Sequence, residues 1–187
     1  NSNTGLVMDV ACIRLDIPKP KFTYRILESN RHGILAAGDN GVYCINEQLQ
    51  ITELYGMQSP DEKQRICNTQ VFDVYEDAPG DWWVATNGEG LIHIHWKGKS
   101  RSDGYEKQVF NEADGLPSDV LYRIEQDEAD NLWISTYNGL VRFNMSTHST
   151  KSYTIHDGIC NNEFNRTSSF RDTDGRMYFG TINGMVE

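Results

Sequence analysis

Short segments in which apolar and polar residues alternate recur along the chain, and residues that favour tight turns separate them. In the clearest example, residues 131–143, an apolar run ends at Thr136 and is followed by Asn138 and Gly139. Asn and Gly tolerate the positive φ that a tight hairpin requires. Alternation resumes over residues 140–143, which is typical of a strand with one buried face. This stretch therefore predicts a β-hairpin.

The hairpin pattern occurs four times, at separations of 48, 50 and 45 positions. The residues matched at the centre of its first strand are Leu35, Trp83, Trp133 and Tyr178. Another alternating strand precedes each hairpin, and a further strand follows three of them, with an aromatic residue near its end at Tyr55, Phe110 and Tyr153. A repeat of four strands in about 45 to 50 residues is typical of a β-propeller blade.

The sequence thus predicts an all-β fold of β-propeller blades, each with four antiparallel strands. One blade cannot bury both of its faces alone, so we expect Trp83, Trp133 and Tyr178 to pack between blades. The predicted blades cover residues 22–55, 71–110, 116–154 and 162–187. Residues 1–21 are expected to hold edge strands of a neighbouring blade or a segment added at the start of the chain. Because the chain holds about four blades and stops inside the last, we expect an incomplete propeller, a fragment of a larger one.

The charge balance narrows the range of partners. The 187 residues include 17 Lys and Arg and 27 Asp and Glu, for a net charge of −10. Nucleic acid is excluded as a partner, because phosphate binding needs a positive surface, and no basic stripe for anionic lipid is present. No long apolar run or signal peptide occurs, so we expect no membrane contact within this chain. No cofactor is expected.

Neither the cysteines nor the histidines predict a metal site. Paired spacing is absent among the cysteines, which are Cys12, Cys44, Cys67 and Cys160. We expect them to be small buried apolar groups, and one disulfide among them stays an open alternative. His93 and His95 lie on one side of one predicted strand, but no third ligand is evident. The acidic turns lack the length of a calcium loop and are interpreted as charged hairpin turns, at residues 76–80, 127–130 and 172–175.

Polar side chains concentrate on one predicted face of the blades. In an up-and-down blade, the turn between the second and third strands shares a face with the loop that leads to the next blade. The predicted ligand-binding residues on this face are Asn87, Glu89, Tyr137, Asn138, Asn162, Glu163, Arg166 and Asn183. Such groups can hydrogen-bond sugar hydroxyls, and tyrosine can stack on a sugar ring. Arg166 is interpreted either as a clamp for an anionic or hydroxylated ligand or as a salt-bridged residue of the channel.

Two segments carry a family resemblance. The stretch that begins Gly115-Leu-Pro-Ser-Asp-Val and continues through Asn131-Leu-Trp-Ile-Ser-Thr resembles the two-component regulator propeller repeat. Residues 157–184 resemble its last-blade variant, which usually precedes an immunoglobulin-like domain. The resemblance implies the periplasmic sensor region of a hybrid two-component system, with a membrane helix, a histidine kinase and often a response regulator outside this chain. It also implies an oligosaccharide ligand and allows a homodimer of the parent receptor.

The leading functional hypothesis is therefore an extracytoplasmic ligand-sensing module for signal transduction, without catalytic residues of its own. The first alternative is a propeller enzyme, a lyase or glycosidase, for which Glu89, Asp119 and Glu163 are available. A glycosidase needs two carboxylates about 5 to 10 Å apart, which the sequence spacing does not establish. The second alternative is a scaffold that binds another protein, which an exposed apolar patch on the loop face would favour.

Overall fold

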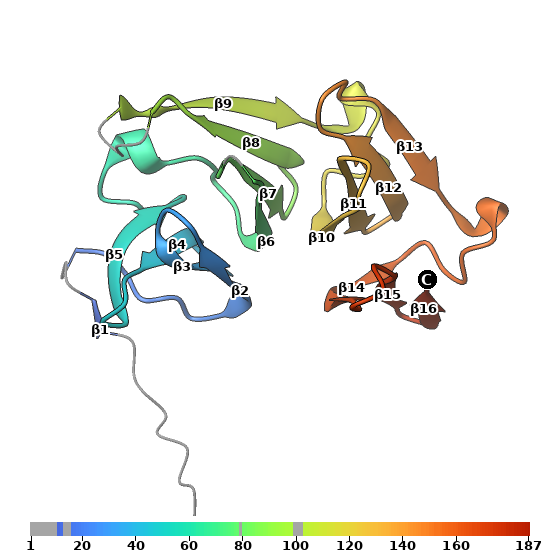
Figure 1. Cartoon of the computed structure of the whole chain (residues 1–187), viewed down its shortest axis with the longest axis horizontal. Helices are drawn as coiled ribbons and strands as arrows, with labels where there is room; N and C mark the ends of the chain where they lie inside the picture. The colour runs from blue at the N-terminus through green and yellow to red at the C-terminus, as the bar shows by residue number, and fades with distance from the viewer. Residues whose placement is uncertain (1–10, 13–15, 79, 99–102) are drawn as a thin grey trace, which may run out of the picture.

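The computed structural model describes residues 11–12, 16–78, 80–98 and 103–187, and it consists almost entirely of β-strands. Four sheets stand side by side around one centre, with the first strand of each sheet nearest that centre (Figure 1). Consecutive strands within a sheet pair antiparallel, as the repeat predicts. In the described part of the chain, no helix is long and apolar enough to cross a membrane. The all-β propeller architecture is thus confirmed.

Each sheet is one copy of the repeat. The first contains β2 (Thr23–Ser29), β3 (Gly33–Gly38), β4 (Gly41–Ile45) and β5 (Gln50–Tyr55). The second contains β6 (Val71–Glu76), β7 (Trp82–Thr86), β8 (Leu91–Trp96) and β9 (Tyr105–Phe110). The third contains β10 (Leu121–Gln126), β11 (Asn131–Thr136), β12 (Gly139–Asn144) and β13 (Thr150–Tyr153). The fourth contains β14 (Phe164–Arg171), β15 (Met177–Thr181) and β16 (Gly184–Val186). Short 3-10 turns lie in the connections, at η1 (Glu62–Gln64), η3 (Glu112–Asp114) and η4 (Ile155–Asp157).

The N-terminal segment adds one strand to the first sheet. β1 (Ala11–Cys12) pairs in parallel with β5 and so extends this sheet. The expectation that an edge strand here belongs to a neighbouring blade therefore does not hold for β1. The physical reason is that the outer edge of β5 offers unpaired backbone groups to an adjacent segment. The other predicted edge-strand positions, residues 1–10 and 13–15, lie outside the described residues. Ile17 is buried with Tyr43 and Leu54 on the outer face of this sheet.

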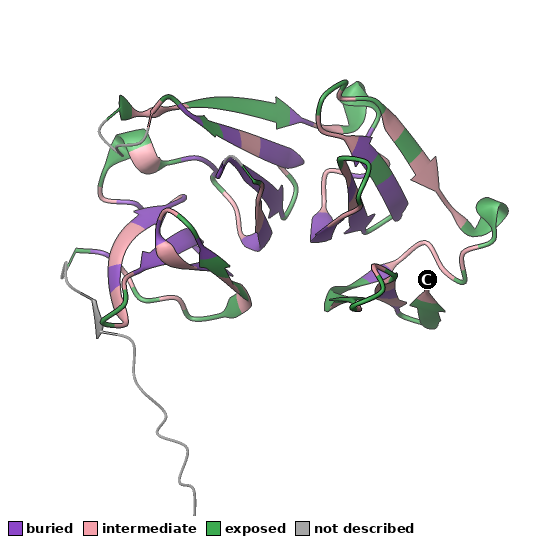
Figure 2. Cartoon of the chain, in the orientation of Figure 1, coloured by how far each residue is buried: buried purple, intermediate pink, exposed green. Residues whose placement is uncertain are grey.

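Aromatic and aliphatic side chains fill the spaces between sheets, and the buried residues lie mainly in the first three sheets (Figure 2). Trp83 is 2% exposed and lies 5.5 Å from the Phe143 ring of the third sheet. Trp133 is half-buried and packs against a cluster that includes Phe164 and Phe179 of the fourth sheet. Tyr178 instead lies beside Phe170 of its own sheet, with ring centroids 6.3 Å apart. The expected packing between blades therefore holds for the two tryptophans and not for Tyr178, whose sheet faces no further blade among the described residues.

Glycine is required at the hairpin turns for two reasons. Gly41 and Gly90 have φ values of 137° and 74°, a region that other residues rarely adopt. A Cβ on Gly41 would also lie 2.2 Å from the carbonyl oxygen of Tyr55, and one on Gly90 would lie 2.1 Å from that of Phe110. Gly139 repeats this relationship in the third sheet. The turn glycine therefore lets the outer strand approach the hairpin in successive blades.

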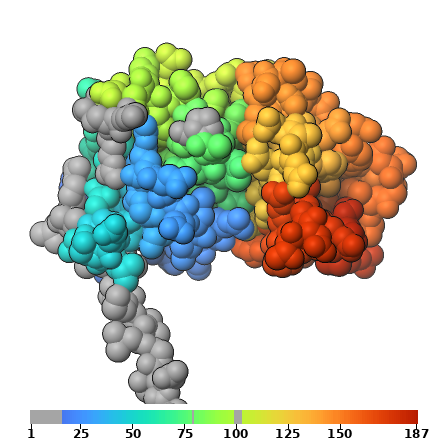
Figure 3. Space-filling model, viewed as in Figure 1, coloured from blue at the N-terminus to red at the C-terminus, as the bar shows by residue number. Residues whose placement is uncertain are grey.

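The innermost strands are irregular in the same way. The pairing register of β2, β6, β10 and β14 shifts within each strand, near its first residues. Such a bulge redirects side chains and increases local twist. Across the centre, β2 and β14 approach each other, and the space-filling view shows the first and fourth sheets close together (Figure 3). The inner strands therefore bring residues from all four sheets to one place.

Candidate functional site

The hairpin turns and the loops between blades lie on one face, as predicted. Gly88 and Gly90 each donate a backbone hydrogen bond to the carbonyl oxygen of Asp119, at 3.1 and 2.9 Å. In the next blade, Gly139 donates to the carbonyl oxygen of Asn162 at 2.7 Å. These bonds tie each turn to the loop that leads into the following sheet. The polar residues of this face consequently sit on a constrained backbone.

A cavity of about 680 Å³ opens on this face, beside the start of β14. It contains four of the eight predicted ligand-binding residues, namely Asn87, Tyr137, Glu163 and Arg166. Its other lining residues are Val120, Tyr122, Phe164, Asn165, Thr167, Ser168 and Ile182. Tyr137 is 55% exposed, so its ring is free to contact a ligand. The cavity thus combines an aromatic ring, amides, one carboxylate and one guanidinium group.

The other four predicted residues do not line the cavity. The carboxylate of Glu89 accepts the backbone N–H of Asn68 at 2.9 Å. Asn162 donates its amide N–H to the side-chain oxygen of Asn138 at 3.3 Å and accepts the backbone N–H of Ile155 at 2.8 Å. Asn183 follows the lining residue Ile182, and its backbone N–H donates a hydrogen bond to the hydroxyl of Thr181. Glu89, Asn138 and Asn162 therefore hold loops in place around the cavity.

Arg166 lies next to a row of aromatic rings on the inner strands. Its guanidinium carbon is 5.4 Å from the centroid of the Phe72 ring. Phe72 in turn contacts Tyr24 and Tyr122, with ring centroids at 5.1 and 5.6 Å. Burial raises the pKa of Tyr122, and the nearby charge of Arg166 opposes this rise. The sequence contained a signal for this row, because Tyr24, Phe72 and Tyr122 recur at the spacing of the repeat.

A charged network at the centre was missed by the sequence analysis. Asp73, with a side chain only 1% exposed, lies 3.4 Å from the guanidinium of Arg123 and 3.7 Å from that of Arg25. Glu125 accepts a 2.6 Å hydrogen bond from Ser169, whose hydroxyl also accepts one from Arg123 at 3.1 Å. These residues come from all four inner strands. The network therefore links the four blades at their centre.

Burial raises the pKa of Asp73 to about 6, although Arg123 and Arg25 both act to lower it. Burial likewise lowers the pKa of Arg123, and the charge of Asp73 opposes that effect. A buried carboxylate loses hydration that its partners only partly replace. Asp73 is also held by the backbone N–H of Ile124 at 2.9 Å. Residues 25, 73 and 123 again follow the repeat spacing, which is the signal that could have found them.

The acidic turns have the structural role that the sequence suggested. In the third blade, Asp127 accepts the backbone N–H groups of Ala129 and Asn131 at 2.8 and 2.9 Å and the indole N–H of Trp133 at 3.0 Å. Burial acts to raise the pKa of Asp127, but hydrogen bonds from Asn131, Trp133 and Ala129 outweigh it and lower the pKa. The aspartate therefore closes its own turn and fixes the tryptophan.

The prediction that the cysteines are buried holds for two of the three whose side chains the structure describes. Cys44 and Cys67 are buried, and burial raises the pKa of Cys67 to about 11. Cys160 is exposed, which corrects the prediction for that residue. It lies on the surface connection before β14, where its sulfur contacts the hydroxyl of Thr181 at 3.3 Å.

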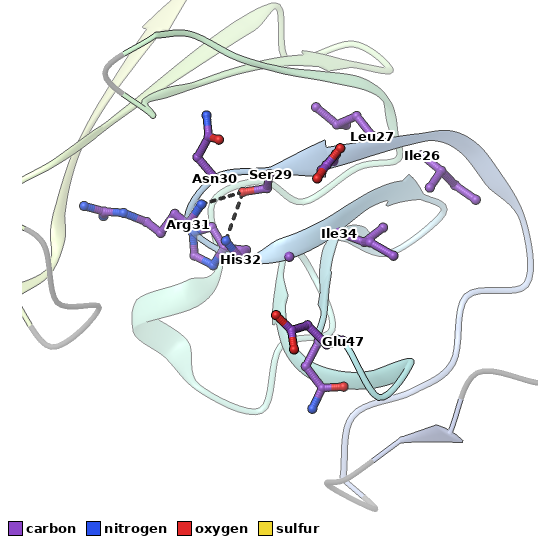
Figure 4. Close-up of a pocket in the computed structure, with 11 residues that line it drawn as sticks. Ile26, Leu27, Ser29, Asn30, Arg31, His32, Ile34 and Glu47 are labelled. Carbon is purple, nitrogen blue, oxygen red and sulfur yellow. Dashed lines mark hydrogen bonds between the residues drawn. The ribbon is translucent and has the colours of Figure 1, made fainter.

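A second cavity, of about 800 Å³, lies on the first sheet and contains none of the predicted residues. It follows the turn between β2 and β3, where the hydroxyl of Ser29 accepts the backbone N–H groups of Arg31 and His32 (Figure 4). Ile26 and Ile34 lie along its strand side (Figure 4). Polar groups from several blades converge at the smaller cavity and not here, so the smaller one is the better candidate site.

Known proteins share this repeat and fold. A family model described as a two component regulator propeller matches residues 115–138, which span the loop before β10 and the following hairpin turn. Histidine kinase P4 of Formosa agariphila is 30% identical over 125 residues, covering 67% of this chain and 9% of that protein. The chain therefore spans only a small part of this curated relative.

Solved structures give the same picture. The extracellular domain of a putative hybrid two-component system from B. thetaiotaomicron is 25% identical, with a TM-score of 0.70, over 88% of this chain and 21% of that one. A second such domain from B. thetaiotaomicron is 20% identical, with a TM-score of 0.68, over 87% and 22% of the two chains. A streptogramin B lyase, 13% identical with a TM-score of 0.57 over 85% and 48% of the two chains, shares the fold alone. The matched repeat, the relative and the common architecture together show that this chain carries the two-component regulator propeller repeat.

Proposed function

We propose that this chain is part of the ligand-sensing propeller region of a hybrid two-component receptor, and that its ligand is an oligosaccharide. The observation that carries the proposal is the cavity where Asn87, Tyr137, Glu163 and Arg166 converge from successive blades. The similarity to extracellular domains of hybrid two-component systems supports a position outside the cytoplasm, in the periplasm. The receptor as a whole would be anchored in the membrane outside this chain.

The lining of the cavity suits a sugar. Amide and carboxylate oxygens accept hydrogen bonds from hydroxyl groups, and amide N–H groups donate to them. The exposed ring of Tyr137 offers a flat apolar surface to the face of a pyranose. Arg166 adds a charge that can bind a sugar carboxylate through two parallel hydrogen bonds. Both neutral and uronic-acid oligosaccharides are consequently candidates.

Signalling then requires that the ligand prefer one receptor arrangement over another. Binding that is stronger in one arrangement of propellers, or of a receptor dimer, shifts the population toward it. Reversing a population of about 1:99 needs about 5.5 kcal/mol of preference. The kinase that reads this shift would lie outside the chain.

Isothermal titration calorimetry with a panel of neutral and uronic-acid oligosaccharides tests the proposal. We expect one class to bind the chain, and Arg166→Ala to weaken that binding about tenfold or more. Arg142→Ala is the matched control, because Arg142 is exposed on β12 and does not line the cavity. Absence of binding to every member of the panel would contradict the oligosaccharide assignment, and equal weakening by both variants would contradict the cavity.

The enzyme alternative receives no support from this geometry. Glu163 is the sole carboxylate among the described residues that line the cavity. Glu89 is bonded to Asn68, and the carboxylate of Asp119 accepts the backbone N–H of Glu112 at 2.8 Å. Of the three carboxylates considered for hydrolysis, Glu163 alone therefore lines the cavity, whereas a glycosidase requires two across one substrate bond.

A further inference from the structure

A cluster of histidine and aspartate side chains lies on the second blade, away from the proposed sugar site. His93 and His95 project from the same side of β8, as their spacing predicts. The turn between β6 and β7 brings Asp77 and Asp81 to them. One ligand atom from each of Asp77, Asp81 and His93 lies within 4.8 Å of the other two. The turn therefore supplies the carboxylates that the sequence did not place beside His93.

The imidazole of His93 has an unused nitrogen at this position. Its Nε2 is buried and makes no hydrogen bond with any described residue. This nitrogen lies 3.8 Å from the carboxylate oxygen Oδ2 of Asp81. A buried polar atom without a partner costs stability, so the fold would gain from a group that fills the space between these two atoms. A metal ion is such a group.

The orientations of these side chains are fixed by their surroundings. The ring of His93 stacks on Trp83, with centroids 3.9 Å apart and planes 10° from parallel. The carboxylate of Asp77 accepts the backbone N–H of Asp81 at 2.9 Å and the indole N–H of Trp83 at 3.3 Å. Supporting contacts of this kind orient metal ligands in proteins. These side chains therefore need to move only slightly to surround an ion.

Asp81 is held on both sides. Its Oδ1 accepts the backbone N–H of Trp96 at 3.0 Å, and its Oδ2 is 2.6 Å from Nδ1 of His95. That second distance is too short for both atoms to bind one ion as neighbouring ligands, since each would lie about 2.0 to 2.2 Å from it. His95 is therefore a positioning residue that aims the Asp81 carboxylate.

We propose that Asp77, Asp81 and His93 form a binding site for Zn²⁺. One imidazole nitrogen and two carboxylates are ligand types that zinc takes, with the remaining position left to water. Calcium and magnesium prefer oxygen ligands throughout, so the imidazole disfavours them. The two carboxylate charges balance the charge of the ion. Bound zinc would fasten the turn between β6 and β7 to β8, and would thereby stabilise the second blade.

Titration calorimetry with Zn²⁺ on the chelator-treated chain tests the site. We expect one ion to bind per chain, and Asp81→Asn and His93→Gln each to weaken binding about tenfold or more. Asp81→Asn keeps an oxygen that can accept the Trp96 N–H, so its fold should survive. His156→Gln and Cys160→Ser are the controls, because both side chains are exposed potential zinc ligands elsewhere. Circular dichroism without metal checks that each variant is folded.

Thermal unfolding supplies a second readout. Excess Zn²⁺ should raise the unfolding temperature of the wild type and of both controls, because an ion that binds only the folded state stabilises it. It should raise that of Asp81→Asn by much less. The proposal is overturned if the wild-type chain takes up no zinc at one ion per chain, or if Asp81→Asn binds zinc as the wild type does. Since neither measurement involves a sugar, the result is independent of the oligosaccharide proposal.

Discussion

The indole N–H of Trp133 donates a 3.0 Å hydrogen bond to the carboxylate of Asp127, six positions earlier in the chain. The same relationship joins Trp83 to Asp77 at 3.3 Å and Tyr178 to Asp172 at 3.4 Å. Each pair couples the acidic turn to the aromatic residue of the following strand. The turn and the core side chain are consequently one structural unit, repeated in three blades.

Replacing Asp127 with alanine should lower the free energy of unfolding by about 2 to 3 kcal/mol, because the indole and two turn amides lose a charged acceptor. Urea unfolding followed by circular dichroism measures the loss. Glu128→Ala is the control, since Glu128 is exposed in the same turn. An equal effect of the two substitutions would show that the Asp127 contacts contribute nothing.

The two tryptophans of the repeat should differ in their contribution to stability. Trp83→Ala is expected to cost about 3 to 5 kcal/mol, since its side chain is 2% exposed between two sheets. Trp133→Ala should cost less, at or below about 3 kcal/mol, because Trp133 is only half-buried. Chemical unfolding of the two variants in parallel tests this order. The reverse order would contradict the packing described for the third and fourth sheets.

Tyr137→Ala separates binding from folding. Because Tyr137 is 55% exposed at the cavity, its removal should change the free energy of unfolding by less than about 0.5 kcal/mol. It should nevertheless weaken binding of the oligosaccharide found by calorimetry. Phe170→Ala, at a residue 62% exposed outside the cavity, is the matched aromatic control. If Tyr137→Ala unfolds the chain, the hairpin is purely structural and the binding surface lies elsewhere.

Asp73 should make stability depend on pH between about 4 and 6. Burial raises its folded-state pKa from 3.8 to about 6. Because this value lies above the unfolded one, the contribution of Asp73 is complete below pH 3.8 and is lost as the pH rises through about 6. The shift corresponds to about 3 kcal/mol.

The measurement compares the wild type with Asp73→Asn, which cannot titrate at this position. The free energy of unfolding of the wild type, minus that of Asp73→Asn, should fall by about 2 kcal/mol between pH 4 and pH 7. Asp174→Asn, at an exposed aspartate of the fourth blade, should show no such change relative to the wild type. A pH-independent difference between wild type and Asp73→Asn would contradict the raised pKa.

The sequence by itself determined the elements and their order. Alternating segments and turn residues such as Asn138 and Gly139 act within a few positions of one another, so they specify each hairpin locally. The repeat spacing then predicted four blades and placed Tyr137 and Arg166 on the face that carries the cavity. These features could be predicted because each copy of the repeat confirms the others.

The tertiary structure alone decided which residues of different strands come into contact and how deeply each is buried. Asp73 and Arg123 become partners only because bulges in β6 and β10 turn them toward a common centre. Likewise, Asp81 approaches His93 only when the β6–β7 turn folds against β8. Burial and proximity between residues of different strands depend on packing that no local pattern encodes. The raised pKa of Asp73 and the unpartnered Nε2 of His93 follow from that packing.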